Sequence, residues 1–262
     1  SALSNESDET IEQAISLLAK IPVMIAYRYR YLNGKKQVPS RTDLSLTANY
    51  LYMLHGVEPA HAHVRALEAY LILTAEHGLN ASTFASRVVA STQSDYYSAI
   101  TAAIGALKGP LHGGAPSEVE DMLERIGTVE NAESWLRERL EQGERLMGFG
   151  HRVYKTKDPR AEALHQVAKE LANEEPWFHL AVHVEQVAMD LLAEYKPGRR
   201  LYTNVEFYAA AVLRAVKLPT QLYTPTFTLS RTAGWTAHIM EQKAKGRIIR
   251  PQSIYSGKMP SE

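Results

Sequence analysis

The sequence predicts an all-α protein, because apolar residues recur at helical spacing along most of the chain and convincing strands of alternating polarity are missing. Of its 262 residues, 45% are hydrophobic and 22% are charged, which is enough to bury a sizeable core in one large domain or two. Residues 27–32 and 247–249 are the only short strand candidates. We therefore expect helices packed against helices.

The first half of the chain is expected to contain a long helix and then shorter ones. Pro22 should kink or divide the first helix, since proline lacks a backbone donor and clashes with the preceding turn. Apolar residues at helical spacing predict helices over residues 43–55, 64–76 and 95–107, with Gly56 as the stop of the first of these. Residues 64–76 are apolar on most sides, which favours a buried helix.

Helices in the second half have recognisable ends. Asp158 and Pro159 are typical of an N-cap followed by proline at the first helical position, and Asn131 is a second candidate N-cap. The predicted helices cover residues 117–126, 131–142, 159–171, 178–194, 207–216 and 226–245. Because no repeat or low-complexity linker separates them, a second domain would be inserted into the first.

The composition argues against several classes of protein. Lys plus Arg and Asp plus Glu number 29 each, so the zero net charge gives no general attraction to nucleic acid or to an anionic membrane. The chain has no cysteine, which excludes disulfides and thiol nucleophiles and fits a reducing compartment. No apolar run approaches the roughly 20 residues of a membrane span, and the polar, acidic start does not read as a signal peptide. We therefore expect a cytoplasmic protein without a nucleic-acid or membrane partner.

Three short segments carry residues suited to acid–base chemistry: GPLHGG, GFGHR and NVEFY. The first two present His112 and His151 between glycines, which let the backbone approach a ligand closely. The third presents Glu206 among apolar neighbours, where desolvation raises a carboxyl pKa and makes a better general base. The alternatives are turn histidines bonded to backbone and a core glutamate satisfied by an arginine.

Cationic residues accompany these segments. Arg160 lies in the first turn of a predicted helix, and helix starts receive anionic groups well. Arg231 lies in a mostly apolar helix, where a buried guanidinium needs a carboxylate or an anionic substrate. A metal site is not favoured, because the closely spaced histidine pairs of the chain come without an HExxH motif.

Ordered, rare motifs along the whole chain resemble the citrate synthase family, most of all its bacterial citrate synthase and 2-methylcitrate synthase branch. The motifs are AEHGLNAST from residue 75, GPLHGG from 109, GFGHRVYKTKDPR from 148, NVEFY from 204, SRTAGW from 230 and RIIRP from 247. The resemblance implies an all-α, two-domain homodimer, with a large domain of residues 1–113 and 217–262 and an inserted small domain of residues 114–216. It also implies that the chain begins inside the family's usual length, so that an N-terminal helical portion is absent.

The resemblance implies a role for each candidate residue. His112 would stabilise the enol of acetyl-CoA, His151 would hydrogen-bond and protonate the oxaloacetate carbonyl, and Glu206 would remove the methyl proton. The implied substrate-binding residues are His77, Arg160, Arg231 and, across the dimer interface, Arg250. The residues implied to hold coenzyme A are Gly148, Phe149, Gly150 and Lys155.

The implied reaction joins acetyl-CoA, oxaloacetate and water to give citrate and coenzyme A, with the thioester as co-substrate and no permanently bound cofactor. The family usually places aspartate where this chain has Glu206, so the longer carboxylate must be set back to reach the same atom. Two alternatives remain open. One is 2-methylcitrate synthesis from propionyl-CoA, since a methylene in an apolar pocket is worth only about 1–3 kcal/mol. The other is a non-catalytic or truncated relative that binds ligand without turnover.

Overall fold

The computed structural model describes residues 8–109, 112–150, 158–172, 175–199 and 201–257, and within these ranges it contains helices and no β-strand. The all-α prediction is therefore confirmed. The helices are α1 Asp8–Leu32, α2 Leu46–His55, α3 His61–Thr74, α4 Ala81–Ser91, α5 Tyr96–Leu107, α6 Ala115–Ile126, α7 Ala132–Glu141, α8 Pro159–Ala172, α9 Pro176–Tyr195, α10 Val205–Ala215 and α11 Tyr223–Lys245. Short 3₁₀ turns precede α7 and α11 at Val129–Asn131 and Thr220–Leu222.

Side-chain caps fix where several helices begin. The side chains of Ser45, Asn80 and Asp95 each accept a hydrogen bond from the backbone N–H three residues further on, so they satisfy a donor that the first turn would leave unpaired. Asn131 occupies the N-cap position of α7, as predicted, but its side chain makes no capping hydrogen bond. Its backbone is already helical, and its amide donates to the Ile126 carbonyl at 3.3 Å instead.

The predictions of short strands at residues 27–32 and 247–249 are wrong. Pro22 does not divide the first helix, so α1 runs without a break through residues 27–32. Its last turn is held by Arg30, whose Nη1 donates to the Leu54 carbonyl of α2 at 2.7 Å. Residues 247–249 follow α11 as extended chain that pairs with no strand in the described ranges.

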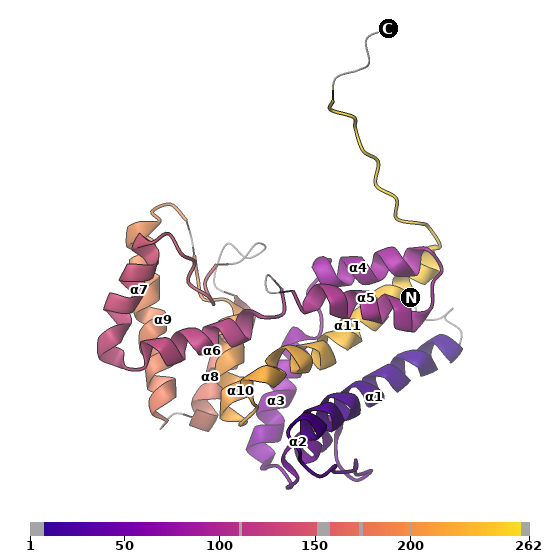
Figure 1. Cartoon of the computed structure of the whole chain (residues 1–262), viewed down its shortest axis with the longest axis horizontal. Coiled ribbons are helices and arrows are strands. Elements are labelled where there is room, and N and C mark those ends of the chain that lie inside the picture. The colour runs from indigo at the N-terminus through magenta and orange to yellow at the C-terminus, as the bar shows by residue number, and fades with distance from the viewer. Residues whose placement is uncertain (1–7, 110–111, 151–157, 173–174, 200, 258–262) are drawn as a thin grey trace.

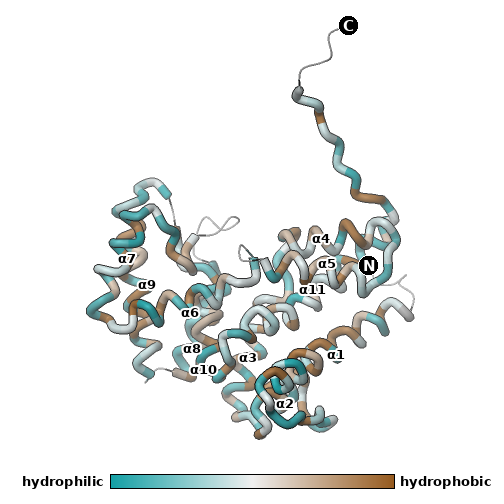
Figure 2. Tube along the Cα trace, viewed as in Figure 1, coloured by the Kyte–Doolittle hydropathy of each residue, from teal (hydrophilic) through white to brown (hydrophobic). Residues whose placement is uncertain are grey.

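The long helix α1 also corrects the expectation that no apolar run approaches a membrane span. By length and composition, Thr10–Leu32 would suffice to cross a membrane, since a window of 18 residues within it has a mean hydropathy of 1.2 (Figure 2). The same composition suits a helix that packs on a protein core. In this structure α1 contacts α2 and α11, and its side chains Ala14, Leu17, Ile21 and Ala26 are buried.

Two helices join the ends of the molecule. Figure 1 shows α6 to α10 gathered at one end and α1, α2, α4 and α5 at the other, with α3 and α11 between them. Helix α11 contacts α1, α3, α4, α5 and α6, and α10 contacts α3, α6 and α8. The residues expected to act together lie on or beside these helices. The division into residues 1–113 with 217–262 and residues 114–216 stays a prediction.

Candidate active site

A carboxylate lies unpaired at the start of α10. Asn204 caps this helix, its side-chain oxygen accepting from the Glu206 N–H at 3.2 Å, which places Glu206 in the first turn. The Glu206 Oε2 is buried and has no hydrogen-bond partner within the described ranges. Burial raises the pKa of this carboxyl, and a backbone hydrogen bond and the nearby charges of Arg160 and Arg231 offset only part of the effect.

The glycine loop of residues 148–150 is fastened to the start of α10. Asn204 donates its backbone N–H to the Gly148 carbonyl at 2.9 Å and its side-chain amide to the Gly150 carbonyl at 3.0 Å. Gly148 has a φ of +85°, and a Cβ there would come within 2.8 Å of the Phe207 ring, so no side chain fits at this position. Phe149 is 7% exposed and packs on Phe207, with ring centroids 5.3 Å apart. The loop therefore holds its place through both backbone and ring contacts.

A buried ion pair marks the start of α8. The Asp158 side chain is 1% exposed, and its Oδ1 accepts from Arg160 Nε at 3.1 Å while its Oδ2 accepts from Nη2 at 2.8 Å. The Asp158 Oδ1 also accepts the Arg160 backbone N–H at 3.0 Å. This bidentate pair fixes the orientation of the Arg160 guanidinium, whose charge acts on Glu206.

A second guanidinium lies deep in α11. Arg231 is 3% exposed, its Nε donates to the Thr74 carbonyl at 2.8 Å, and its guanidinium lies 4.7 Å from the centroid of the Phe227 ring. Burial lowers the pKa of Arg231 to about 10, and the positive charge of Arg160 acts in the same direction. Two arginines close enough to repel one another favour an anion between them.

A histidine held by a serine faces this arginine. His112 Nε2 lies 2.8 Å from Ser82 Oγ, and Ser82 also accepts from Trp235 Nε1 at 3.1 Å. The His112 ring meets the Phe227 ring edge-on, with centroids 6.3 Å apart. Burial lowers the pKa of His112, and the charge of Arg231 lowers it further, so the ring is neutral at pH 7. When Ser82 donates to Nε2, the single ring proton lies on Nδ1 and is available as a donor.

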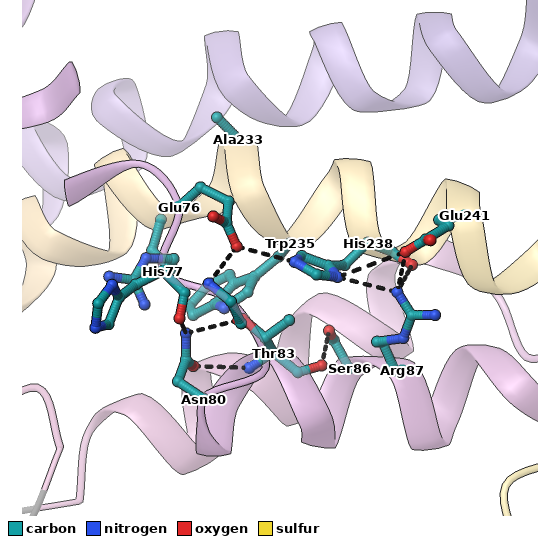
Figure 3. Close-up of polar contacts among 12 residues, drawn as sticks. Glu76, His77, Asn80, Thr83, Ser86, Arg87, Ala233, Trp235, His238 and Glu241 are labelled. Atoms are coloured by element: carbon teal, nitrogen blue, oxygen red, sulfur yellow. Dashed lines mark hydrogen bonds and ion pairs between the residues drawn. The ribbon is translucent and has the colours of Figure 1, made fainter. Parts of the chain in front are cut away.

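The loop that carries His77 joins α3 to α4. Its carbonyl at Ala75 accepts from the Gly234 N–H of α11 at 3.2 Å. Asn80 closes the loop on the other side, because its amide lies 3.5 Å from the His77 carbonyl while its oxygen caps α4. Figure 3 shows the His77 ring pointing away from the polar contacts of Glu76.

The structure thus gathers part of the predicted set. Arg160 and Arg231 act electrostatically on Glu206, Arg231 also acts on His112, and the glycine loop contacts the same end of α10. Arg250 is not among them, since it is exposed on the extended segment that leaves the helical body after α11 (Figure 1). His151 and Lys155 lie outside the described residues.

Sequence reasoning missed several neighbours of this cluster. Ser82 fixes His112, and Asp158, which the sequence marked only as an N-cap, fixes Arg160. Tyr70 of α3 has a buried hydroxyl without a hydrogen-bond partner in the described ranges. The charges of Arg231 and Glu206 act on the pKa of this hydroxyl. No pattern in the sequence signals Ser82 or Tyr70, because their contacts join different elements of the fold. The pairing of Asp158 with Arg160 is local but was not recognised.

The arrangement combines a desolvated carboxylate, a neutral imidazole and two guanidinium groups. A carboxylate with a raised pKa can take a proton from carbon, and an oriented imidazole can donate to the oxygen on which negative charge then develops. Guanidinium groups match the geometry of carboxylates. The cluster therefore suits proton abstraction next to a carbonyl in the presence of an acidic second substrate.

Comparisons with known proteins agree with this chemistry. Residues 1–252 match the family model described as citrate synthase, C-terminal domain. The chain is 46% identical over 248 residues to citrate synthase 2 of Bacillus subtilis, covering 94% of this chain and 65% of that protein. It is 43% identical over 246 residues to a citrate synthase of Synechocystis, covering 93% of this chain and 61% of that protein. The chain thus spans just under two thirds of the length of these relatives.

Solved structures show the same relation. A citrate synthase from Thermotoga maritima superposes with a TM-score of 0.87 at 40% identity, covering 98% of this chain and 70% of that one. A citrate synthase from Thermoplasma acidophilum, in a ternary complex with carboxymethyl coenzyme A and oxaloacetate, superposes with a TM-score of 0.90 at 31% identity, covering 100% of this chain and 71% of that one.

Proposed function

The chain belongs to the citrate synthase family, and on that premise we propose that it condenses acetyl-CoA with oxaloacetate and water to give citrate and coenzyme A. The observation that carries the proposal is the buried Oε2 of Glu206, which has no hydrogen-bond partner among the residues that the structure describes. It opens a helix beside two guanidinium groups and is desolvated as a general base should be. The ligands in the Thermoplasma acidophilum complex support the same pair of substrates.

The first step is removal of a methyl proton from the thioester. Glu206 takes that proton, and His112, as a neutral donor through Nδ1, stabilises the enol oxygen as charge develops on it. Ser82 supports this by occupying Nε2. A base and a donor on opposite sides of the same group make the enol accessible without a full negative charge.

The second step joins the enol carbon to the oxaloacetate carbonyl. Arg160 and Arg231 bind the two carboxylates, and His77 lies on the loop beside them. His151, which lies outside the described residues, polarises the carbonyl and protonates its oxygen. Water then hydrolyses the thioester to release citrate and coenzyme A. Binding of oxaloacetate before the thioester allows domain closure to exclude water until condensation is complete.

Coenzyme A is expected to lie along the loop of residues 148–150 and Lys155. The Gly148 and Gly150 carbonyls accept from Asn204 and the Gly150 N–H donates to the Tyr202 carbonyl, so a ligand would meet a loop that is fixed in place. The Phe149 side chain is committed to packing on Phe207, so its part in binding would come from its backbone. The thioester serves as co-substrate, and no permanently bound cofactor is required.

Thiol release from acetyl-CoA in the presence of oxaloacetate tests the proposal. We expect turnover with the full chain and its near loss in Glu206→Gln. Equal activity in the two proteins would exclude Glu206 as the base. Tight oxaloacetate binding without any turnover would favour the non-catalytic alternative.

Propionyl-CoA is the alternative acyl donor, because the apolar pocket that selects the acyl group involves differences of only about 1–3 kcal/mol per methylene. We expect a higher kcat/KM for acetyl-CoA. A preference for propionyl-CoA would reassign the enzyme to 2-methylcitrate synthesis. The comparison uses the same thiol-release measurement with oxaloacetate held at saturation.

We also infer that the enzyme works as a homodimer in which Arg250 reaches the partner's site. The residue is exposed on an extended segment together with apolar side chains, among them Ile254 at 94% and Tyr255 at 70% exposure (Figure 1). Mixing Arg250→Ala with His151→Ala proteins should restore part of the turnover through hybrid dimers. Failure after proven subunit exchange would show that each site is built from a single chain. The cytoplasmic location stays a prediction.

A further inference from the structure

We propose that His238 is a positioning residue for His77: through Glu76 it fixes the loop that presents the His77 ring to the oxaloacetate carboxylates. The residue lies on α11, outside the groups assigned to the reaction, and is joined to the loop by side-chain hydrogen bonds (Figure 3). The inference rests on the proposed function, because it assigns a task to the residue that orients a substrate-binding loop.

The Glu76 carboxylate brackets His77 in the chain. Its Oε1 accepts the backbone N–H of Gly78 at 2.5 Å and lies 3.0 Å from His238 Nε2. One oxygen therefore ties the residue before His77 to the residue after it and ties both to α11. Burial opposes ionisation, but the hydrogen bonds from His238 and Gly78 outweigh it and lower the pKa of Glu76, so the carboxylate stays charged at neutral pH.

The orientation of the His238 ring follows from its second nitrogen. Nδ1 lies 3.0 Å from Arg87 Nη1, and a guanidinium can only donate, so Nδ1 is the acceptor. In the neutral ring the proton must then lie on Nε2, where it is donated to Glu76. Arg87 thereby selects the tautomer that can hold the loop.

Arg87 is itself held from both sides. Its side chain is 10% exposed, its Nε donates to Gln242 Oε1 at 3.1 Å, and its Nη1 donates to Glu241 Oε2 at 2.5 Å. Hydrogen bonds from Arg87 and Lys245 lower the pKa of Glu241 to about 2. The chain of contacts from Glu241 through Arg87 and His238 to Glu76 therefore anchors the loop to α4 and α11 at once.

A backbone contact from the same helix supports this assignment. Gly234, one turn before His238, donates its N–H to the Ala75 carbonyl at 3.2 Å, and a Cβ at this position would lie 2.4 Å from that oxygen. The loop thus rests directly on the backbone of α11. Figure 3 shows the Glu76 carboxylate facing His238, while the His77 ring points away from the polar contacts. The network therefore holds the loop from the side of Glu76 that faces α11.

The test is steady-state kinetics and oxaloacetate calorimetry on the full chain carrying His238→Ala. We expect the KM and Kd for oxaloacetate to rise by about 10- to 100-fold, the scale of a misplacement of ~1 Å, with kcat and the KM for acetyl-CoA changed far less. His238→Gln should recover most of the affinity, because its amide can donate to Glu76 from a similar position. Glu76→Ala should reproduce the loss and Glu76→Gln should recover it.

Arg137→Ala is the matched control. This arginine is also tied to glutamates, at 3.0 Å from Glu133 and 2.9 Å from Glu194, but on α7. Its kinetics should stay within about twofold of wild type, as for other surface changes. The assignment is overturned if His238→Ala leaves the oxaloacetate KM within that range, or if His238→Gln is as weak as His238→Ala. Wild-type protein that neither binds oxaloacetate nor releases coenzyme A would overturn the proposed function, and the His238 assignment with it.

Discussion

The starts of α8 and α10 each carry a buried carboxylate, and the two differ in their hydrogen-bond partners. At α8, both oxygens of Asp158 are paired with Arg160, two residues further on. At α10, the Oε2 of Glu206 has no partner in the part of the chain that the structure describes, although Arg160 and Arg231 act on it electrostatically. The charge of Asp158 is balanced by Arg160, whereas Glu206 is proposed to act on a ligand.

The difference distinguishes a carboxylate with a structural role, Asp158, from one that is proposed to act as a general base, Glu206. A buried charge without a partner costs several kcal/mol unless it takes up a proton, so a fold gains nothing from leaving one unpaired. Helix α8 contacts α10, and its residue Arg160 acts electrostatically on Glu206. The Arg160 guanidinium nevertheless forms its ion pair with Asp158. The raised pKa of Glu206 is therefore the property that a general base requires.

The largest expected effect comes from removing the unpaired charge. Glu206→Gln should lower kcat by about 10²- to 10⁴-fold, the usual contribution of a general base, while the protein stays folded. Thiol release and thermal unfolding measure the two properties separately. If activity falls only because less protein is folded, then Glu206 has a structural role like that of Asp158, and the contrast between these two carboxylates is lost.

Glu120→Gln is the control for that experiment. Glu120 of α6 is also a buried carboxylate, 3% exposed, and burial raises its pKa, but it is paired with Arg214 away from the cluster. Its replacement should change stability more than turnover. Equal losses of kcat in the two variants would mean that any buried carboxylate in this fold is needed for activity.

The second expected effect is on the paired carboxylate. Asp158→Asn should reduce the free energy of unfolding by about 3 kcal/mol, because a neutral amide no longer balances the charge of the buried Arg160 guanidinium. The KM for oxaloacetate should rise, since Arg160 loses the contact that orients it. Denaturant unfolding and steady-state kinetics measure both changes.

The exposed pair of Arg41 and Asp43 provides a matched comparison. It has the same spacing of two residues, but the Asp43 side chain is 63% exposed. Asp43→Asn should therefore reduce the free energy of unfolding far less than Asp158→Asn does, as is usual for surface ion pairs. Similar costs at Asp43 and Asp158 would show that burial adds nothing to the second pair.

Most of the fold was predictable because helices are specified locally. The cap at Asp95 and the proline at position 159 mark their helix starts within one or two residues. The failures came where longer-range contacts override a local pattern. Residues 27–32 look like a strand in isolation, yet Arg30 reaches the Leu54 carbonyl of the neighbouring helix, and the helix continues.

The site was predictable only in part. Glu206 and His112 were singled out by their sequence context, and in the structure the charge of Arg231 acts on both. Their catalytic roles stay predictions. Their supporting residues were not found, because the contacts join distant parts of the chain. The bond from His238 to Glu76 spans 162 residues, and no periodicity or motif encodes such a pairing.

A smaller effect is expected where a neutral residue supports the imidazole that is proposed to act together with this carboxylate. Ser82→Ala removes the hydroxyl that meets His112 Nε2 at 2.8 Å, so the ring loses its preferred tautomer. We expect kcat to fall by about 10-fold, within the range for residues that orient a catalytic group, with KM for oxaloacetate little changed. Ser82→Thr keeps the hydroxyl and should retain more activity than Ser82→Ala. A loss shared equally by kcat and folding stability would instead place Ser82 in the packing around Trp235.

The smallest expected effect is on the pH dependence of stability, and it returns to the same carboxylate. Because the pKa of Glu206 is raised in the folded protein, the folded state holds this proton at pH values where the unfolded chain has released it. The stabilisation is complete below the unfolded pKa of about 4.3 and is lost as the pH rises through the folded pKa. Glu206→Gln cannot lose a proton, so its stability relative to wild type should increase as the pH rises through the folded pKa of Glu206 and then level off. Denaturant unfolding of both proteins between pH 4 and pH 8 measures this difference. A gap that stays constant across the range would mean that the folded carboxyl titrates like an exposed one, and the contrast with Asp158 would then rest on geometry alone.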